Sequence, residues 1–332
     1  MKTAECVSPK HPDKMADQIS DAILDLCLAQ DPFSRVAVEV LGGHGEMLIC
    51  GEVTTKAAIV KDEIRAIVVR IVGYEPHINI NIVEQSPEIA GGVDTGGAGD
   101  QGIMVGYACR ENPAMIPHEL YLARNLCECL FEIFPFDGKT QITLDDNGLV
   151  HTIVASFQNA PKDKLEELIN VWVSVHEEEV RKGLKIHANP AGDWMQGGFD
   201  ADTGLTGRKL AVDNYGVQFP IGGGAFSGKD ATKVDRSAAY MARKIAVDLL
   251  KVNRDAQDCV VKIAYAIGVA QPVMATATLK YDGLEDKEID LLAEWQYNLT
   301  PKAIIEALDL RKPQFEETAR WGHFGRGFTW DK

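Results

Sequence analysis

The sequence predicts an α+β protein of three domains related by an approximate internal threefold, with mixed or antiparallel sheets packed against helices. Three stretches carry apolar residues at helical spacing, and they begin at Asp13, Pro117 and Lys233. Each is followed by two strand-like runs and then by a second helical stretch. Units of about 105 to 115 residues that share this order indicate three domains built on one plan.

In the first unit the helical stretch reads DKMADQISDAILDLCLAQ, with Ile19, Ile23 and Leu26 on one face. The strand-like runs RVAVEVL and EMLICGEVTT follow around the turn GGHG. The stretch KDEIRAIVVRIVGY then predicts the second helix of this unit.

The second unit starts with the helical stretch PHELYLARNLCECLFEI. Its strands TQITLDD and LVHTIVASF flank Asn147-Gly148, and Asn-Gly between alternating apolar runs is a strong hairpin signal. The second helix is predicted in DKLEELINVWVSVHEEEVRKG.

The third unit has the helical stretch KVDRSAAYMARKIAVDLLKV, the strands CVVKIAYAIGV and VMATATLKY, and a second helix predicted in KEIDLLAEWQYN. Helices on one face of an antiparallel sheet leave its other face free to pack on a neighbour. A homo-oligomer is therefore expected.

The composition is that of a globular protein, with 45% hydrophobic and 25% charged residues among 332. The net charge of -15 repels nucleic-acid phosphates and anionic membrane surfaces, so neither is an expected partner. Seven cysteines without a C-x-x-C pair indicate neither a disulfide framework nor a structural zinc site. Together with the lack of a secretory leader or membrane span, they predict a cytoplasmic protein.

Two glycine-rich connections, 88–102 and 189–230, are the expected sites of function, because such long irregular segments usually form lids or binding loops. The second contains GGGAFSGKD, which differs from a P-loop in having Asp230 where that motif needs Ser or Thr. Asp230 and the lack of a strand-loop-helix context argue against a P-loop ATPase or kinase.

Charged residues gather in and beside the second connection. They are Arg208, Lys209, Lys229 and Lys233, with Asp202, Asp230 and Asp235 interleaved. Glycines admit an anion, cations neutralise it and carboxylates hold magnesium, so the segment suits a polyphosphate. A solvated loop with Asp230 as a helix cap is the alternative.

Glu5, His11, Asp13 and Lys14 form a second cluster just before the first helix. They could ligate a metal and contact a phosphate at a helix N-terminus, or Asp13 could be an N-cap. No H-E-x-x-H motif exists, which disfavours a zinc hydrolase.

Two isolated residues are ambiguous. Lys139 precedes a strand and by itself reads as a turn lysine. Trp194 could stack on a purine or lie at the edge of the core.

Taken together, these motifs resemble the S-adenosylmethionine synthetase (methionine adenosyltransferase) family. The segments that carry the resemblance run in the family's order from residue 5 to residue 326: HPDKMADQISDAILD, CGEVTT, EQSPEI, GAGDQGIMVGYA, DGKTQITLD, GLTGRKLAVDNYG, GGGAFSGKDATKVDRSAAYMAR, AYAIGVAQP and GHFGR. GAGDQG and the GGGAFSGKD segment are the most specific.

The resemblance implies three α+β domains with pseudo-threefold symmetry, and a homodimer or dimer of dimers with active sites between subunits. It implies that the sulfur of L-methionine displaces tripolyphosphate from C5′ of ATP, and that the tripolyphosphate is then hydrolysed to pyrophosphate and phosphate. We expect an N-terminal domain at 1–88, a lid at 89–102, a central domain at 103–195 and a C-terminal domain at 196–332, with the structural domains interleaved.

The resemblance also assigns roles to residues. Those matched to catalysis are His11, Lys139, Asp202, Arg208 and Lys229, and those matched to ATP or its phosphates also include Asp137, Trp194, Lys209 and Ala225. Glu52, Gln85, Asp202 and Lys233 match methionine-binding positions. Glu5, Asp13 and Asp235 match ligands of two Mg²⁺ ions per site, and Glu39 matches a K⁺ ligand.

The sequence departs from the family pattern at several places. Pro9-Lys10 replaces Glu-Gly before the histidine, Gly192-Asp193-Trp194 replaces Gly-Arg-Phe, and GGFDAD replaces Gly-Pro-Met-Gly-Asp. The segment between Gln85 and GAGDQG is shorter than in familiar bacterial members, which predicts a less complete lid. A silent nucleotide-binding relative with a regulatory role is the alternative function, but the retained cationic, metal and methionine positions favour an active enzyme.

Overall fold

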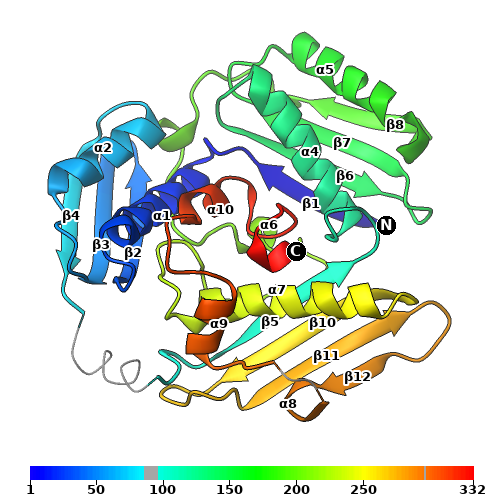
Figure 1. Cartoon of the computed structure of the whole chain (residues 1–332). Helices are drawn as coiled ribbons and strands as arrows, with labels where there is room; N and C mark the ends of the chain where they lie inside the picture. Colours follow the sequence, from blue (N-terminus) through cyan, green and yellow to red (C-terminus); the bar gives the residue numbers. More distant parts are fainter. Residues whose placement is uncertain (86–95, 295–296) are drawn as a thin grey trace.

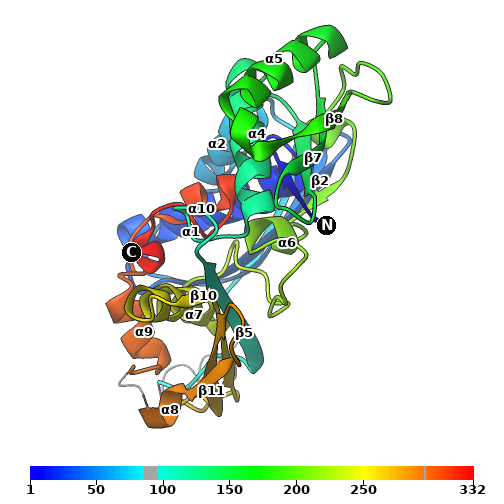
Figure 2. The same cartoon turned by 90° about the vertical axis from the view of Figure 1, so that its right-hand side faces the viewer.

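The computed structural model describes residues 1–85, 96–294 and 297–332. It contains three four-stranded sheets (Figure 1). Figure 1 shows the sheets around a centre that holds α1 (Pro12–Gln30), α6 (Leu210–Asp213), α10 (Phe315–Trp321) and the C-terminus. The molecule is narrower in the view turned by 90° (Figure 2). The three-domain α+β architecture predicted from the sequence is confirmed.

The sheet nearest the N-terminus has the order β1 (Lys2–Val7), β6 (Gly138–Leu144), β7 (Val150–Phe157) and β8 (Val180–Ala188). Helices α4 (His118–Ile133) and α5 (Lys162–Val175) cover it (Figure 1). The predicted Asn147-Gly148 hairpin joins β6 and β7, because Gly148 has a φ of 80° that suits the turn.

The second sheet has the order β4 (His77–Val83), β3 (Glu46–Thr54), β2 (Arg35–Gly43) and β9 (Gly204–Leu205), with α1 and α2 (Lys61–Val72) packed on it. The third has the order β12 (Lys287–Asp290), β11 (Met274–Tyr281), β10 (Ala256–Tyr265) and β5 (Gly102–Cys109), with α7 (Val234–Val252) and α9 (Pro301–Ala307). The short elements are 3₁₀ helices at 177–179, 198–200 and 329–331, and α8 (Leu291–Glu294).

Each sheet recruits one strand from a distant part of the chain. β1 pairs with β6, β9 pairs with β2, and β5 pairs with β10. The chain segments are therefore interleaved in space, while the boundaries expected at 88, 102 and 195 stay a prediction.

Two predicted helices are wrong in part. KEID forms the edge strand β12 because Ile289 packs into the core beside β11. Leu291–Glu294 is helical after it, and residues 295–296 of the predicted helix lie outside the described ranges. The second helix of the central unit ends at Val175, and Val180–Ala188 continues as strand β8, parallel to β7.

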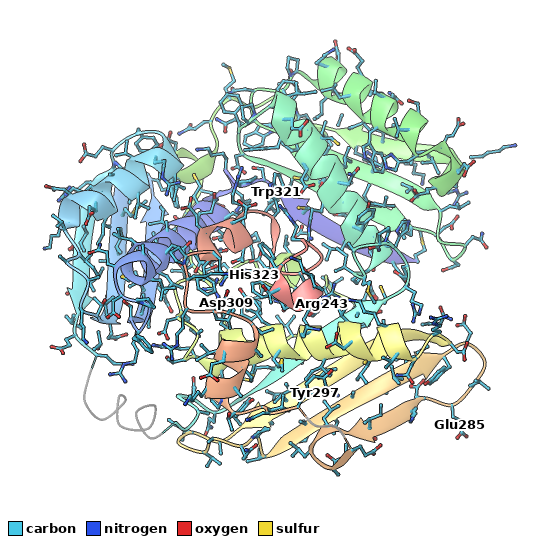
Figure 3. All side chains as sticks on the ribbon, viewed as in Figure 1. Arg243, Glu285, Tyr297, Asp309, Trp321 and His323 are labelled. Carbon is cyan, nitrogen blue, oxygen red and sulfur yellow. The ribbon has the colours of Figure 1, made fainter. Side chains whose placement is uncertain are left out.

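Hydrogen bonds of buried polar side chains stabilise the centre of the molecule, where Figure 3 places Arg243 and His323. His323 Nδ1 and the Tyr240 hydroxyl are 2.6 Å apart, and the carbonyl of His323 accepts from the indole of Trp330. Arg243 donates to Asp331 and to main-chain carbonyls of Tyr107 and Met115. Trp330 and the side chain of Asp331 thus lie inside the fold, while Lys332 is exposed.

None of the helices in the described ranges combines the length and apolar character needed to cross a bilayer.

Candidate active site

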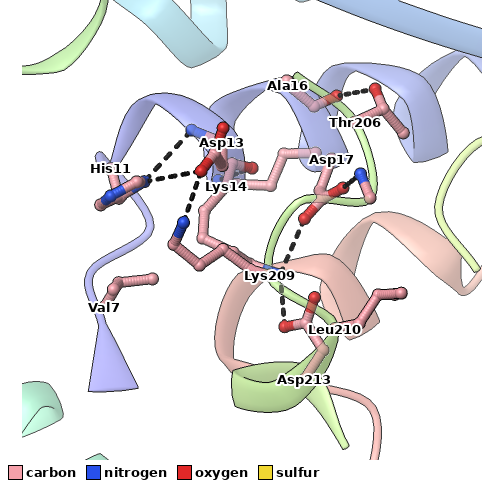
Figure 4. A network of polar contacts seen from close by, with 12 residues as sticks. Val7, His11, Asp13, Lys14, Ala16, Asp17, Thr206, Lys209, Leu210 and Asp213 are labelled. Carbon is pink, nitrogen blue, oxygen red and sulfur yellow. Dashed lines mark hydrogen bonds and ion pairs between the residues drawn. The ribbon is translucent and has the colours of Figure 1, made fainter. Parts of the chain in front are cut away.

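The N-terminus of α1 is the centre of the first group of predicted site residues (Figure 4). The helix starts here because Pro12 fits its first turn and His11 is an extended N-cap whose Nδ1 accepts from the amide of Asp13 at 3.2 Å. Nδ1 of a neutral His11 is therefore unprotonated, so the ring proton lies on Nε2.

Asp13 is a buried carboxylate surrounded by donors. It accepts from the amide of Leu205 at 3.0 Å and from Lys209 Nζ at 2.5 Å, and Arg208 Nε lies 3.7 Å away. Burial alone would raise the pKa of Asp13, but Lys209 and the Leu205 amide outweigh it and hold the pKa below its usual value. Asp13 thus stays ionised and gathers both cations of the 204–209 segment.

Behind Asp13 lies a fully buried ion cluster. Lys14 Nζ donates to Asp213 Oδ1 at 2.6 Å and to Asp17 Oδ2 at 3.1 Å (Figure 4). Burial would lower the pKa of Lys14, but the two carboxylates raise it. Burial raises the pKa of Asp17 to about 7. Lys14, placed in the N-terminal cluster by the sequence, therefore faces the interior and not a ligand.

Cations surround His11 from two elements. Burial, then Lys209, then Lys139 lower the pKa of His11 to about 3. Lys139 lies on β6 opposite Val7 of β1, and Glu5 lies opposite Gln141 in the same register. Side chains at Glu5 and Lys139 project from the same face of the sheet, since they are diagonal neighbours across the two strands.

The charge state of His11 gives a testable expectation. With its pKa near 3, the free protein should hold His11 as the neutral Nε2–H tautomer across pH 5 to 9. Nitrogen-15 NMR of labelled imidazoles measures this directly, and His11→Asn assigns the signal. An imidazolium signal from His11 at pH 6 would contradict the expectation.

The remaining predicted residues of this group lie beside it. Asp137 is buried, accepts from the amide of Gly198 at 2.9 Å, and helps line a cavity of about 340 Å³. Burial raises the pKa of Asp137. Trp194 is half-buried, with its indole 3.4 Å from the side-chain oxygen of Asn189, and Asp202 is exposed.

The second group of predicted residues lines a different cavity of about 250 Å³ on the sheet of β2 and β3. Glu39, Glu52 and Lys229 share it, together with the exposed thiol of Cys50. Lys229 Nζ donates to Asp235 Oδ2 at 2.8 Å. A Cβ at Gly224 would lie 2.2 Å from the Asp235 carboxylate, so a larger residue there would displace the Asp235 side chain.

Asp230, which breaks the P-loop pattern, has a structural role. Its Oδ1 accepts from the amide of Val36 at 2.8 Å and from Lys233, and its Oδ2 accepts from the amide of Thr232. Asp230 thus ties the glycine-rich loop to β2. The alternative of a solvated loop with Asp230 as a helix cap is wrong, because Asp230 is 2% exposed and the N-cap of α7 is Lys233. Lys233, matched to methionine binding, is 18% exposed and paired with Asp230.

Two further predicted residues have informative positions. Ala225 approaches Gly207, where an added Cβ would lie 2.6 Å from the Ala225 methyl, so the two glycine-rich segments pack on each other. Gln85 has a buried side-chain oxygen with no hydrogen-bond partner among the described residues. Residues 86–95, which hold the first half of the expected lid at 89–102, lie outside the described residues.

Family comparisons cover nearly the whole chain. The N-terminal, central and C-terminal domains of S-adenosylmethionine synthetase match residues 1–94, 95–194 and 196–332. The chain belongs to the S-adenosylmethionine synthetase family.

Curated relatives agree with this assignment. Proteins named S-adenosylmethionine synthase from Wolinella succinogenes and Salinibacter ruber are each 41% identical to the chain, with 99% of the chain and 95% of each relative covered. One from Desulforudis audaxviator is 42% identical over 98% of the chain and 93% of its own length. The first two alignments span 366 positions against 332 residues here, so these relatives carry residues that this chain lacks.

S-adenosylmethionine synthetases use metal ions. Within the described ranges, no three His, Cys, Asp or Glu side chains come together as a metal site. Asp13 and Asp235 are each paired with a lysine, and Glu5 lies on β1. The three predicted magnesium ligands are thus not assembled within one ligand-free chain.

Two departures from the S-adenosylmethionine synthetase pattern have structural contacts. Lys10 donates to the main-chain carbonyl of Ile71 and lines the cavity that also contains Asp137. Asp193 accepts from the amide of Lys162 at 2.9 Å, at the start of α5. The inverted charge at Asp193 thus stabilises a helix N-terminus.

Proposed function

We propose that this protein makes S-adenosylmethionine from ATP and L-methionine. The observation that carries the proposal is the convergence of Arg208 and Lys209 on Asp13, with Lys139 close enough to depress the pKa of His11. A tripolyphosphate leaving group gathers negative charge as the C5′–O bond breaks, and fixed cations stabilise that charge.

The proposed reaction needs few other catalytic groups from the chain. The methionine sulfur has no proton to lose, so its attack on C5′ needs no general base. His11 presents Nε2–H as a donor suited to the leaving oxygen, since its Nδ1 is occupied by the Asp13 amide. Asp137, Trp194, Asp202 and Ala225 are proposed to contact ATP, and the unpartnered oxygen of Gln85 supports its proposed place, with Glu52 and Lys233, at methionine.

The donor set suits hard cations. Glu5, Asp13 and Asp235 would hold two Mg²⁺ ions and Glu39 would hold K⁺, because carboxylates are the ligands these ions prefer. Asp13 is paired with Lys209 and Asp235 with Lys229, so each carboxylate that would hold a metal lies beside a cation that would contact phosphate oxygens. Bound magnesium would neutralise charge on the polyphosphate.

We propose a homodimer, or a dimer of dimers, with active sites between subunits. The predicted residues fall into two groups on one chain, one at the start of α1 and one in the cavity of Glu52 and Lys229. The sheet faces away from the helices expose apolar side chains, including Leu41 at 43% and Ile103 at 54%. All seven cysteines are free thiols, which supports a cytoplasmic location.

A turnover assay tests the proposed function. The protein is incubated with ATP, methionine, magnesium and potassium, and its products are separated. Equimolar S-adenosylmethionine, pyrophosphate and phosphate are expected. ADP as the product would overturn the proposal, and ATP binding without methionine-dependent turnover would favour the silent, regulatory relative.

Cys50 reports on the second cavity. Iodoacetamide should modify Cys50 more slowly when ATP and methionine are added, because the thiol lines the cavity of Glu52 and Lys229. Cys129 on α4, the other exposed cysteine, is the internal control and should react at one rate throughout. Peptide mass spectrometry follows both. Equal and substrate-independent rates at the two thiols would count against the cavity as a substrate site.

A further inference from the structure

Helix α1 carries four aspartates at intervals of four residues, at positions 13, 17, 21 and 25. Residues four apart lie on one helix face and about 6 Å apart along its axis. All four carboxylates accept main-chain amides from segments distant in the sequence: Asp13 and Asp17 from Leu205 and Gly207, Asp21 from Gly228, and Asp25 from 314–316 at the start of α10. Only Asp13 is matched to a ligand by the sequence.

Asp17 fixes the segment that carries Arg208 and Lys209. Its Oδ1 accepts from the amide of Gly207 at 2.8 Å, directly before those cations. Through Lys14 it is joined to Asp213, four residues beyond Lys209. The segment is thus held at both ends by one buried cluster.

Asp21 fixes the segment that carries Lys229. It accepts from the amide of Gly228 at 2.8 Å and from both terminal nitrogens of Arg236, and Arg236 also donates to the carbonyl of Lys229 at 3.0 Å. Asp21 and Arg236 are both 0% exposed. Gly228 has a φ of 80° and a Cβ there would lie 1.9 Å from the Val38 carbonyl, so only glycine allows the loop to lie this close to β2.

Buried charge pairs are a costly way to gain stability, because desolvation consumes much of their attraction and apolar residues often serve as well. A fixed geometry is the benefit that such pairs offer in its place. We propose that Asp17 and Asp21 are positioning residues, which hold the main chains of Arg208, Lys209 and Lys229 at set places along α1. This inference rests on the proposed function.

Double-mutant cycles test it, with both turnover and the binding of inorganic tripolyphosphate as readouts. Asp17→Asn and Asp21→Asn should each lower kcat by about 10- to 100-fold. When Lys209→Ala is already present, adding Asp17→Asn should lower kcat by only about a further twofold. Adding Asp21→Asn to Lys229→Ala should likewise lower kcat by only about a further twofold. In the crossed pair Asp17→Asn with Lys229→Ala, the two losses should multiply. Tripolyphosphate affinity should follow the same pattern.

Asp25→Asn is the matched control, since Asp25 holds only the amides of residues 314–316, which carry no group of the proposed site. It should leave kcat unchanged. If either asparagine variant fails to fold, Lys14→Arg or Arg236→Lys, which keep the buried charge, take its place in the cycle.

The two proposals fail in different ways. Absence of turnover by the unaltered protein overturns the proposed function, while the tripolyphosphate cycles still test the positioning role. The positioning role is overturned if the losses multiply within the pair Asp17 and Lys209 or the pair Asp21 and Lys229. It is also overturned if the asparagine variants fold and keep both kcat and tripolyphosphate affinity unchanged.

Discussion

Replacing Lys229 with alanine should reduce adenosyl transfer by about 100- to 1,000-fold, the loss typical of removing one group that stabilises developing charge. The reason is that the cavity lined by Glu39 and Glu52 loses the cation of Lys229, so the charge that develops on the polyphosphate is no longer neutralised there.

Lys244→Ala is the matched control for this experiment. Lys244 lies on α7 and pairs with Asp248 four residues along the same helix, outside both groups of proposed site residues. Rates of S-adenosylmethionine formation under single-turnover conditions separate the chemical step from product release. A rate for Lys229→Ala within a few-fold of the Lys244→Ala rate would remove Lys229 from its assigned role.

Replacing Arg236 with methionine should destabilise the fold by about 3–5 kcal/mol, because it leaves Asp21 as an uncompensated buried charge. Asp21 would keep the Gly228 amide but lose two guanidinium bonds of 2.7 and 2.8 Å. Methionine fills similar space, so the loss reports on the charge pair more than on a cavity. Urea unfolding followed by circular dichroism measures the change.

An exposed pair on the same helix provides the comparison. Lys244→Met breaks the pair with Asp248, whose side chains are 27% and 26% exposed. Partly exposed pairs of this kind contribute about 1 kcal/mol or less. Equal losses for Arg236→Met and Lys244→Met would show that burial of the Asp21–Arg236 pair has no special weight.

The local elements of the fold could be predicted from sequence because their signals are local. The periodicity of 13–30 and the Asn147-Gly148 turn depend on neighbours in the chain. The strand β12 could not, since KEID adopts an extended form only through pairing with β11. The same holds for β1, β5 and β9, whose partners lie far away in the chain and leave no mark in their own short sequences.

The site shows a similar division. Motif matches selected Asp13 and Lys229, and the structure pairs each with a charged neighbour of the predicted set. Asp17 and Asp21 were missed, although their four-residue spacing in DKMADQISDAILD was visible. That spacing indicates a shared helix face, but their partners, the amides of Gly207 and Gly228, are defined only by the folded main chain.

The burial of Trp330 links the segment that follows α10 to the stability of α7. Trp330 is 0% exposed and stacks on Tyr240 with ring centroids 3.8 Å apart, and Asp331 accepts from Arg243 and from the amides of Gly325 and Arg326. Opening of 323–331 would uncover Tyr240 and Arg243 together on α7. Conditions that first free this segment should therefore also loosen α7, although the helix's own backbone hydrogen bonds do not involve it.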